Sequence, residues 1–96
     1  MNFSQFAESL ATNQPPGLPD TLLCLWHDAR GDWETAHAIA QEIHSPSGSL
    51  LHAYLHRKEG DKFNASYWYN KAGEPVPEVS LEEEWKNLVK RFLPEY

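Results

Sequence analysis

Two histidines, His52 and His56, stand four residues apart in the segment LLHAYLHRKEGD. If this segment is helical, residues four apart lie on the same face, so the two imidazoles could bind one divalent metal ion. A third and a fourth ligand would have to come from elsewhere in the chain. Glutamate does not follow His52, which excludes the H-E-x-x-H arrangement of zinc proteases. The alternative interpretation is that both imidazoles lie at the helix surface or form hydrogen bonds to a neighbouring helix.

Arg57 and Lys58 follow directly and place positive charge near the end of the same segment. The helix dipole favours positive charge at a C-terminus, so the two residues need no further function. The planar guanidinium of Arg57 could also bind a carboxylate or a phosphate through two parallel hydrogen bonds. The alternative for Arg57 is a local salt bridge to Asp28 or Glu59.

Other catalytic patterns are absent from the sequence. Asp32 and Asp61 could be taken for paired acids, but each follows a glycine and precedes an expected helix, which is the position of a helix cap. The sequence contains no glycine-rich phosphate loop, no G-x-S-x-G and no C-x-x-C. The absence of these motifs favours a protein that is not an enzyme and that needs no cofactor.

Composition excludes broad nucleic-acid binding. The chain has 96 residues, a formal net charge of −6 and a pI near 5.2. Proteins that bind single-stranded nucleic acids combine aromatic side chains with a basic groove, which this charge does not provide. We therefore expect five aromatic side chains of the two predicted hairpins to pack in the core and between helices. They are Trp33, Phe63, Tyr67, Trp68 and Tyr69.

The sequence predicts a cytoplasmic protein with no membrane association. The one cysteine, Cys24, cannot form an internal disulfide, and its apolar neighbours predict that it is buried. No apolar run reaches the length of about 18 residues that a membrane span requires. The first residues, MNFSQFAESL, lack the basic start and the apolar stretch of a signal peptide.

Apolar residues recur at helical spacing along the whole chain, and no stretch shows the alternation of a β-strand. The pattern predicts one all-α domain over residues 1–96 with about six helices. Helix hairpins are expected at residues 20–43 and 49–73, separated by a loop at 44–48. Further helices are expected at residues 3–12 and 81–93.

The two hairpins look like copies of one unit, because Gly60-Asp61 repeats Gly31-Asp32 after 29 residues. The same offset pairs His27 with His56. His27 is therefore the predicted third ligand of a metal site with His52 and His56, together with Asp28 or Glu59. This arrangement predicts an alternative function, a small metal-binding or hydrolytic protein.

The residues GDWETA (31–36) and GDKFNASYWYNKAG (60–73) resemble tetratricopeptide repeats, and the second copy is similar to the Sel1-like branch. The resemblance covers about residues 20–77. Glycine, alanine and proline stand at the places that the pattern requires, although the 29-residue spacing is shorter than the usual 34. The blocks LWHDARGDWETAH and HAYLHRKEGD also resemble those of small microbial proteins, a likeness that implies no activity.

The resemblance implies a right-handed stack of hairpins that acts as a protein-binding, ligand-binding or assembly module. Two units are few for such a stack, so the first and last helices are expected to cover its two ends, and a second copy of the chain could cover remaining apolar surface. In this arrangement Tyr54, Arg57 and Lys58 would face Asp28 and His27. These five residues form the predicted binding site for a protein or a small anionic ligand.

Overall fold

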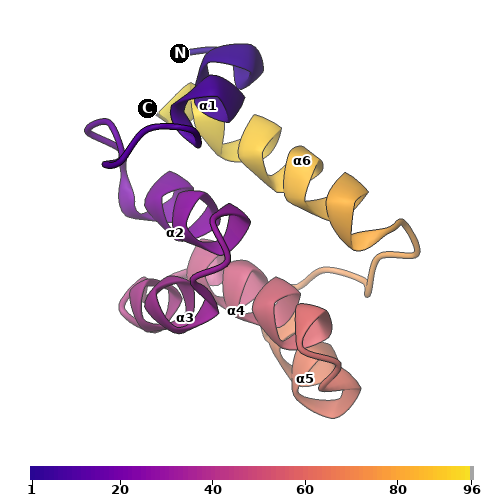
Figure 1. Ribbon diagram of the computed structural model, residues 1–96. Coiled ribbons are helices and arrows are strands. Elements are labelled where there is room, and N and C mark those ends of the chain that lie inside the picture. The colour runs from indigo at the N-terminus through magenta and orange to yellow at the C-terminus, as the bar shows by residue number, and fades with distance from the viewer. Residues whose placement is uncertain (96) are drawn as a thin grey trace.

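The computed structural model describes residues 1–95, and all regular structure within them is helical (Figure 1). The six α-helices are α1 (Phe3–Ser9), α2 (Asp20–Ala29), α3 (Trp33–Gln41), α4 (Pro46–Lys58), α5 (Lys62–Ala72) and α6 (Leu81–Phe92). A short 3₁₀ helix, η1 (Leu93–Glu95), follows α6. The structure confirms the predicted all-α class.

Helices α2 and α3 form one hairpin, and α4 and α5 form the next. Gly31 and Gly60 make the two turns with φ angles of 81° and 88°, a conformation that favours glycine. Asp32 and Asp61 each accept a hydrogen bond from the backbone N–H three residues later, at 3.1 and 3.2 Å. Both aspartates therefore act as helix caps, as predicted.

Helix α4 begins at Pro46, inside the segment for which the sequence predicts a loop. Proline is favoured in the first helical turn because its fixed φ suits a helix and its missing N–H has no partner there. Gly48 lies in the same turn, buried against the backbone of Ile43. The Ser-Pro-Ser-Gly composition is typical of a turn, which is why the sequence predicts a loop here. Gly48 is needed because the helix packs closely against Ile43, and this contact cannot be inferred from the local sequence.

Helices α1 and α6 lie side by side instead of covering opposite ends of the hairpins (Figure 1). The rings of Phe3 and Phe6 pack against Trp85, with centroids 5.9 and 6.0 Å apart. Helix α6 also packs against α2 and α4, and Trp85 Nε1 donates a hydrogen bond to the Leu25 carbonyl at 3.1 Å. The first helices of both hairpins are thus covered by the same C-terminal helix.

Cys24 is fully buried in the core, as predicted. Its Sγ donates to the Ala36 carbonyl at 3.3 Å, which brings α2 and α3 close together. Burial, with a smaller effect of the nearby Asp28 charge, raises the pKa of the Cys24 thiol to about 12. A thiol with this pKa is not reactive near neutral pH.

Candidate functional site

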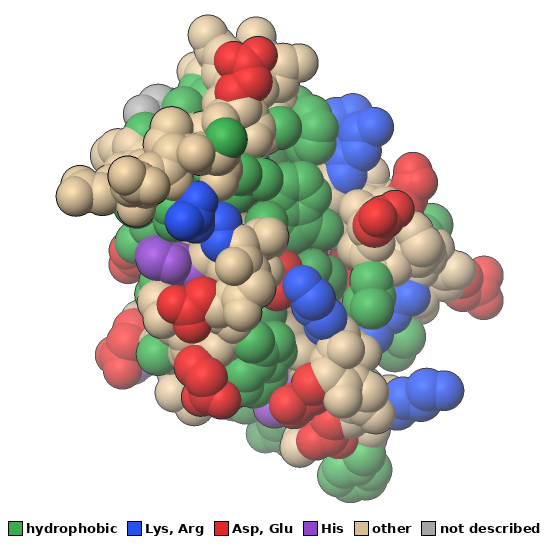
Figure 2. Space-filling view, viewed as in Figure 1, with side chains coloured by type: hydrophobic (Ala, Val, Ile, Leu, Met, Phe, Trp, Pro, Cys, Tyr) green, Lys and Arg blue, Asp and Glu red, His purple; other side chains and the backbone are tan. Residues whose placement is uncertain are grey.

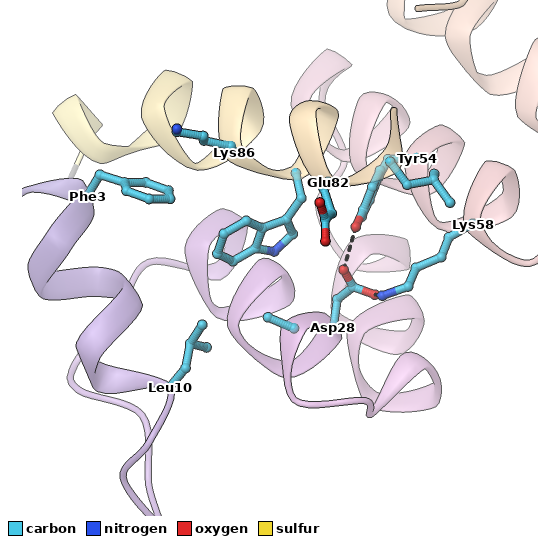
Figure 3. A pocket seen from close by; sticks show the side chains of 10 residues that line it. Phe3, Leu10, Asp28, Tyr54, Lys58, Glu82 and Lys86 are labelled. Atoms are coloured by element: carbon cyan, nitrogen blue, oxygen red, sulfur yellow. Dashed lines mark hydrogen bonds and ion pairs between the residues drawn. The ribbon is translucent and has the colours of Figure 1, made fainter. Parts of the chain in front are cut away.

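A groove of about 520 Å³ opens where α1, α2, α4 and α6 meet (Figure 3). Apolar side chains make up most of its wall, and apolar side chains gather in the same region of the surface in Figure 2. The residues that line it are Phe3, Leu10, Asp28, Ala29, Tyr54, Lys58, Leu81, Glu82, Trp85 and Lys86.

Three of the five residues of the predicted binding site meet in this groove. Tyr54 donates its hydroxyl to Asp28 Oδ2 at 2.7 Å, and Lys58 Nζ donates to Asp28 Oδ1 at 2.9 Å (Figure 3). Asp28 is only 1% exposed, so these two bonds compensate a buried negative charge. Burial, followed by the effect of Asp28, raises the pKa of the Tyr54 phenol well above its usual value, so Tyr54 remains a hydrogen-bond donor.

Arg57 does not reach the groove, and its predicted salt bridge to Asp28 or Glu59 is wrong. Its Nη1 donates to Glu84 Oε1 at 2.7 Å, and its Nη2 donates to the Val79 carbonyl. Successive residues of a helix point in different directions, so Arg57 and its neighbour Lys58 serve different faces of α4. Arg57 therefore attaches α4 to α6 and to the segment before it.

His27 is also not among the described residues that line the groove. Its ring lies edge-on to the neighbouring Trp26 ring, with centroids 5.2 Å apart. The predicted site of five residues is therefore reduced to Asp28, Tyr54 and Lys58.

A second cluster brings His52 and His56 together with His37 of α3. The Nε2 atoms of His37 and His52 are 2.9 Å apart, and the rings of His52 and His56 stack with centroids 4.8 Å apart. One ligating atom from each of the three side chains lies within 4.8 Å of the others. Trp33 stacks on His37 at 4.7 Å and Trp68 stacks on His52 at 4.1 Å. This histidine cluster joins the two hairpins.

His37, and not the predicted His27, is the third member of the histidine cluster. The repeat equates His27 with His56, but α4 packs against α3 of the preceding hairpin, whereas no hairpin precedes α2. Equivalent positions therefore have different neighbours. One sequence signal for His37 is its place four residues after Trp33, which puts an aromatic ring and an imidazole on one face of α3.

The imidazoles of His37 and His52 favour the neutral form. Burial, with smaller effects of His37 and His56, lowers the pKa of His52 to about 4. Burial and the neighbouring His56 also lower the pKa of His37. Neutral imidazoles can accept hydrogen bonds or bind a metal ion through the free ring nitrogen.

The lowered pKa of His52 predicts that the metal-free protein loses stability in weak acid. Between the ordinary pKa of 6.5 and the folded value of about 4, the unfolded chain binds more protons, so stability falls as pH decreases. The expected loss between pH 7 and pH 5 is about 2 kcal/mol. Urea unfolding at both pH values, in the presence of a chelator, measures it.

The His52→Asn variant is the control for this pH dependence. Its unfolding free energy is expected to change much less between pH 7 and pH 5, because the titrating imidazole is absent. Equal pH dependence of the native protein and of His52→Asn contradicts the assignment to His52.

Comparison with known proteins assigns no family to the chain. No protein-family model matches it, and neither a curated protein nor a solved structure matches it. The resemblance to tetratricopeptide repeats therefore rests on the residues at 31–36 and 60–73. Within residues 1–95, no helix combines the length and the apolar character that crossing a bilayer requires.

Proposed function

We propose that this chain is a small helical binding module whose groove between α1, α2, α4 and α6 receives a partner. The observation that carries the proposal is an open, mostly apolar groove whose lining includes two lysines, Lys58 and Lys86, and two acidic residues, Asp28 and Glu82, of which Asp28 is already bonded to Lys58. Concave apolar sites with a few placed polar groups are the usual form of ligand sites. The groove also lies at the junction of four helices, where positions far apart in the sequence form one surface.

The groove suits an apolar group that carries a carboxylate. Phe3, Leu81 and Trp85 offer an apolar wall, and the amino groups of Lys58 and Lys86 can donate hydrogen bonds to an anion. The side chain of Lys58 is 39% exposed, so it can contact a ligand while it remains bonded to Asp28. A protein segment with an apolar side chain next to an acidic one presents the same chemistry as a small amphipathic acid.

The proposal is for binding and not for catalysis. The buried carboxylate of Asp28 already accepts bonds from Tyr54 and Lys58, an arrangement that stabilises the junction of α2 and α4. We also propose that the two hairpins stack in the right-handed manner of tetratricopeptide and Sel1-like repeats and that the protein acts in the cytoplasm. The packing of α4 against both α3 and α5 supports the stacking.

Calorimetric titration with 4-phenylbutyrate, an apolar acid, tests the binding proposal. Binding to the native protein is expected, and Lys58→Ala should weaken it about tenfold, the effect of removing one hydrogen bond to a charged group. Lys62→Ala on the exposed surface of α5 is the matched control and should bind as the native protein does.

A second pair of variants tests whether the ligand occupies the groove itself. Ala29 is exposed and lines the groove, so Ala29→Phe should fill the site and prevent binding without disturbing the core. Ala38→Phe introduces the same side chain at an exposed position of α3 and should have no effect. Absence of binding to the native protein at millimolar concentrations, or equal affinities for both phenylalanine variants, contradicts the proposal.

A further inference from the structure

We propose that His37, His52 and His56 bind one transition-metal ion of the zinc class between α3 and α4. The site shares no residue with the groove, so the inference is independent of the proposed function. It differs from the histidine site predicted from sequence in its third ligand, which comes from the preceding hairpin. The metal would therefore connect the two hairpins.

The spacing of the three imidazoles fits a single ion. Two nitrogen ligands at 2.0 to 2.1 Å from a tetrahedral zinc ion lie about 3.3 to 3.4 Å apart. The Nε2 atoms of His37 and His52 are 2.9 Å apart, so the pair needs to open by only about half an ångström to admit an ion. All three ligating atoms already lie within 4.8 Å of one another.

Glu59 holds His56 in a suitable orientation. Its Oε1 lies 2.8 Å from His56 Nδ1, a contact that places the ring proton on Nδ1. Nε2 then keeps its free electron pair and is the nitrogen available to a metal. A carboxylate on the non-ligating nitrogen is the common partner of metal-binding histidines, where it fixes the tautomer and increases the basicity of the ligand.

Tryptophan rings fix the other two imidazoles. Trp33 Nε1 donates to the Leu55 carbonyl at 2.9 Å, and the anchored ring stacks on His37 with only 10° between the planes. Trp68 stacks on His52, which is 8% exposed. Ligands held in place by packing lose little conformational entropy on binding, and an apolar surrounding limits competition from water.

The chemistry of the ligands selects the class of metal. Neutral imidazole nitrogen suits Zn²⁺, Cu²⁺, Ni²⁺ and related ions, whereas Ca²⁺ and Mg²⁺ prefer oxygen. Three histidines leave one position of a tetrahedron to water, which is the ligand arrangement of many zinc sites with an exchangeable position. We therefore expect Zn²⁺ and Co²⁺ to bind and Mg²⁺ not to bind.

A competing group of possible ligands consists of His56, Glu59 and Asp61. In this second group Asp61 already has a structural role as the cap of α5. Glu59 is exposed, so its carboxylate can contact water. The two arrangements share His56 but differ in His37 and Asp61. Variants of His37 and Asp61 therefore distinguish them.

Metal titration of tag-free protein that has been treated with a chelator tests the site. One equivalent of Zn²⁺ should bind, and an excess should raise the melting temperature because the ion binds only the folded chain. His37→Ala and His56→Ala should each weaken the affinity for Zn²⁺ at least tenfold. Both side chains are partly exposed, so these variants are expected to fold.

Three control variants complete the experiment. His27→Ala and His44→Ala remove histidines outside the cluster, and Asp61→Asn keeps a side chain that can cap a helix. All three should bind Zn²⁺ with native affinity. Glu59→Gln keeps the shape of the side chain that orients His56 but removes its negative charge. This variant should weaken Zn²⁺ binding about tenfold without lowering the melting temperature of the metal-free protein.

Several results would overturn the proposal. The first is that the native protein binds less than a tenth of an equivalent of both Zn²⁺ and Co²⁺. The second is that His37→Ala binds Zn²⁺ as tightly as the native protein. The third is that Asp61→Asn loses as much affinity for Zn²⁺ as His37→Ala, or more. The stoichiometry of the native protein does not depend on any variant, so poor folding of a variant leaves the test valid.

Discussion

Replacement of Glu84 by alanine is expected to lower the free energy of unfolding by about 3 to 5 kcal/mol, the usual cost of breaking a buried ion pair. Glu84 is 5% exposed and accepts a hydrogen bond from Arg57 at 2.7 Å and one from the Tyr69 hydroxyl at 2.5 Å. Its carboxylate therefore connects α6 with both α4 and α5. Its removal leaves a partly buried guanidinium and a buried hydroxyl without this acceptor.

Urea unfolding followed by circular dichroism measures this change. Glu82→Ala is the matched control on the same helix, because Glu82 is exposed, and it should change stability by less than about 0.5 kcal/mol. The double variant Arg57→Met, Glu84→Leu should recover part of the loss, since it leaves no unpaired guanidinium, whereas the Tyr69 hydroxyl still lacks its acceptor. A loss below about 1 kcal/mol in Glu84→Ala would show that the carboxylate does not stabilise the position of α6.

Gly48→Ala is expected to destabilise the fold by at least about 2 kcal/mol, although alanine is the better helix former by about 1 kcal/mol. A Cβ atom at this position would lie 1.8 Å from the Ile43 carbonyl oxygen and 2.8 Å from its carbon. Both are backbone atoms, so the segment between α3 and α4 would have to move. The steric effect should therefore exceed the gain in helix propensity.

Thermal unfolding of Gly48→Ala and Gly17→Ala separates the steric effect from a general effect of glycine replacement. A Cβ atom added at Gly17 would have no heavy atom within 4 Å, and the φ angle of Gly17 is not positive. Gly17→Ala should therefore leave the melting temperature nearly unchanged. A melting temperature of Gly48→Ala at or above that of the native protein would contradict the close packing of α4 against Ile43.

The hairpins could be predicted from sequence because their signals are local. Gly31 and Gly60 each stand directly before an aspartate, and the chemistry of both residues defines a turn without reference to other parts of the chain. The position of α6 could not be predicted in this way. It depends on contacts between residues far apart in sequence, such as Trp85 with the carbonyl of Leu25.

The candidate site was predictable only in part for the same reason. Lys58, which was expected to face Asp28, bonds to it, because α2 and α4 pack against each other. Arg57 lies on a different face of α4 from Lys58, because neighbouring residues of a helix diverge, and its partner Glu84 lies on α6, whose position the repeat does not define. The sequence alone does not predict that His37 joins the cluster, because only the packing of α3 against α4 brings it to His52.

The most direct test of the binding proposal uses the four tryptophan indole N–H signals in a ¹⁵N-labelled protein. Trp85 lines the groove, whereas Trp33 and Trp68 stack on the histidine cluster. Addition of 4-phenylbutyrate should shift the Trp85 signal and leave those of Trp33 and Trp68 in place. Addition of Zn²⁺ should produce the opposite pattern. A 4-phenylbutyrate titration in which Trp85 does not move, or moves no more than Trp33 and Trp68, would contradict a binding groove between α1, α2, α4 and α6.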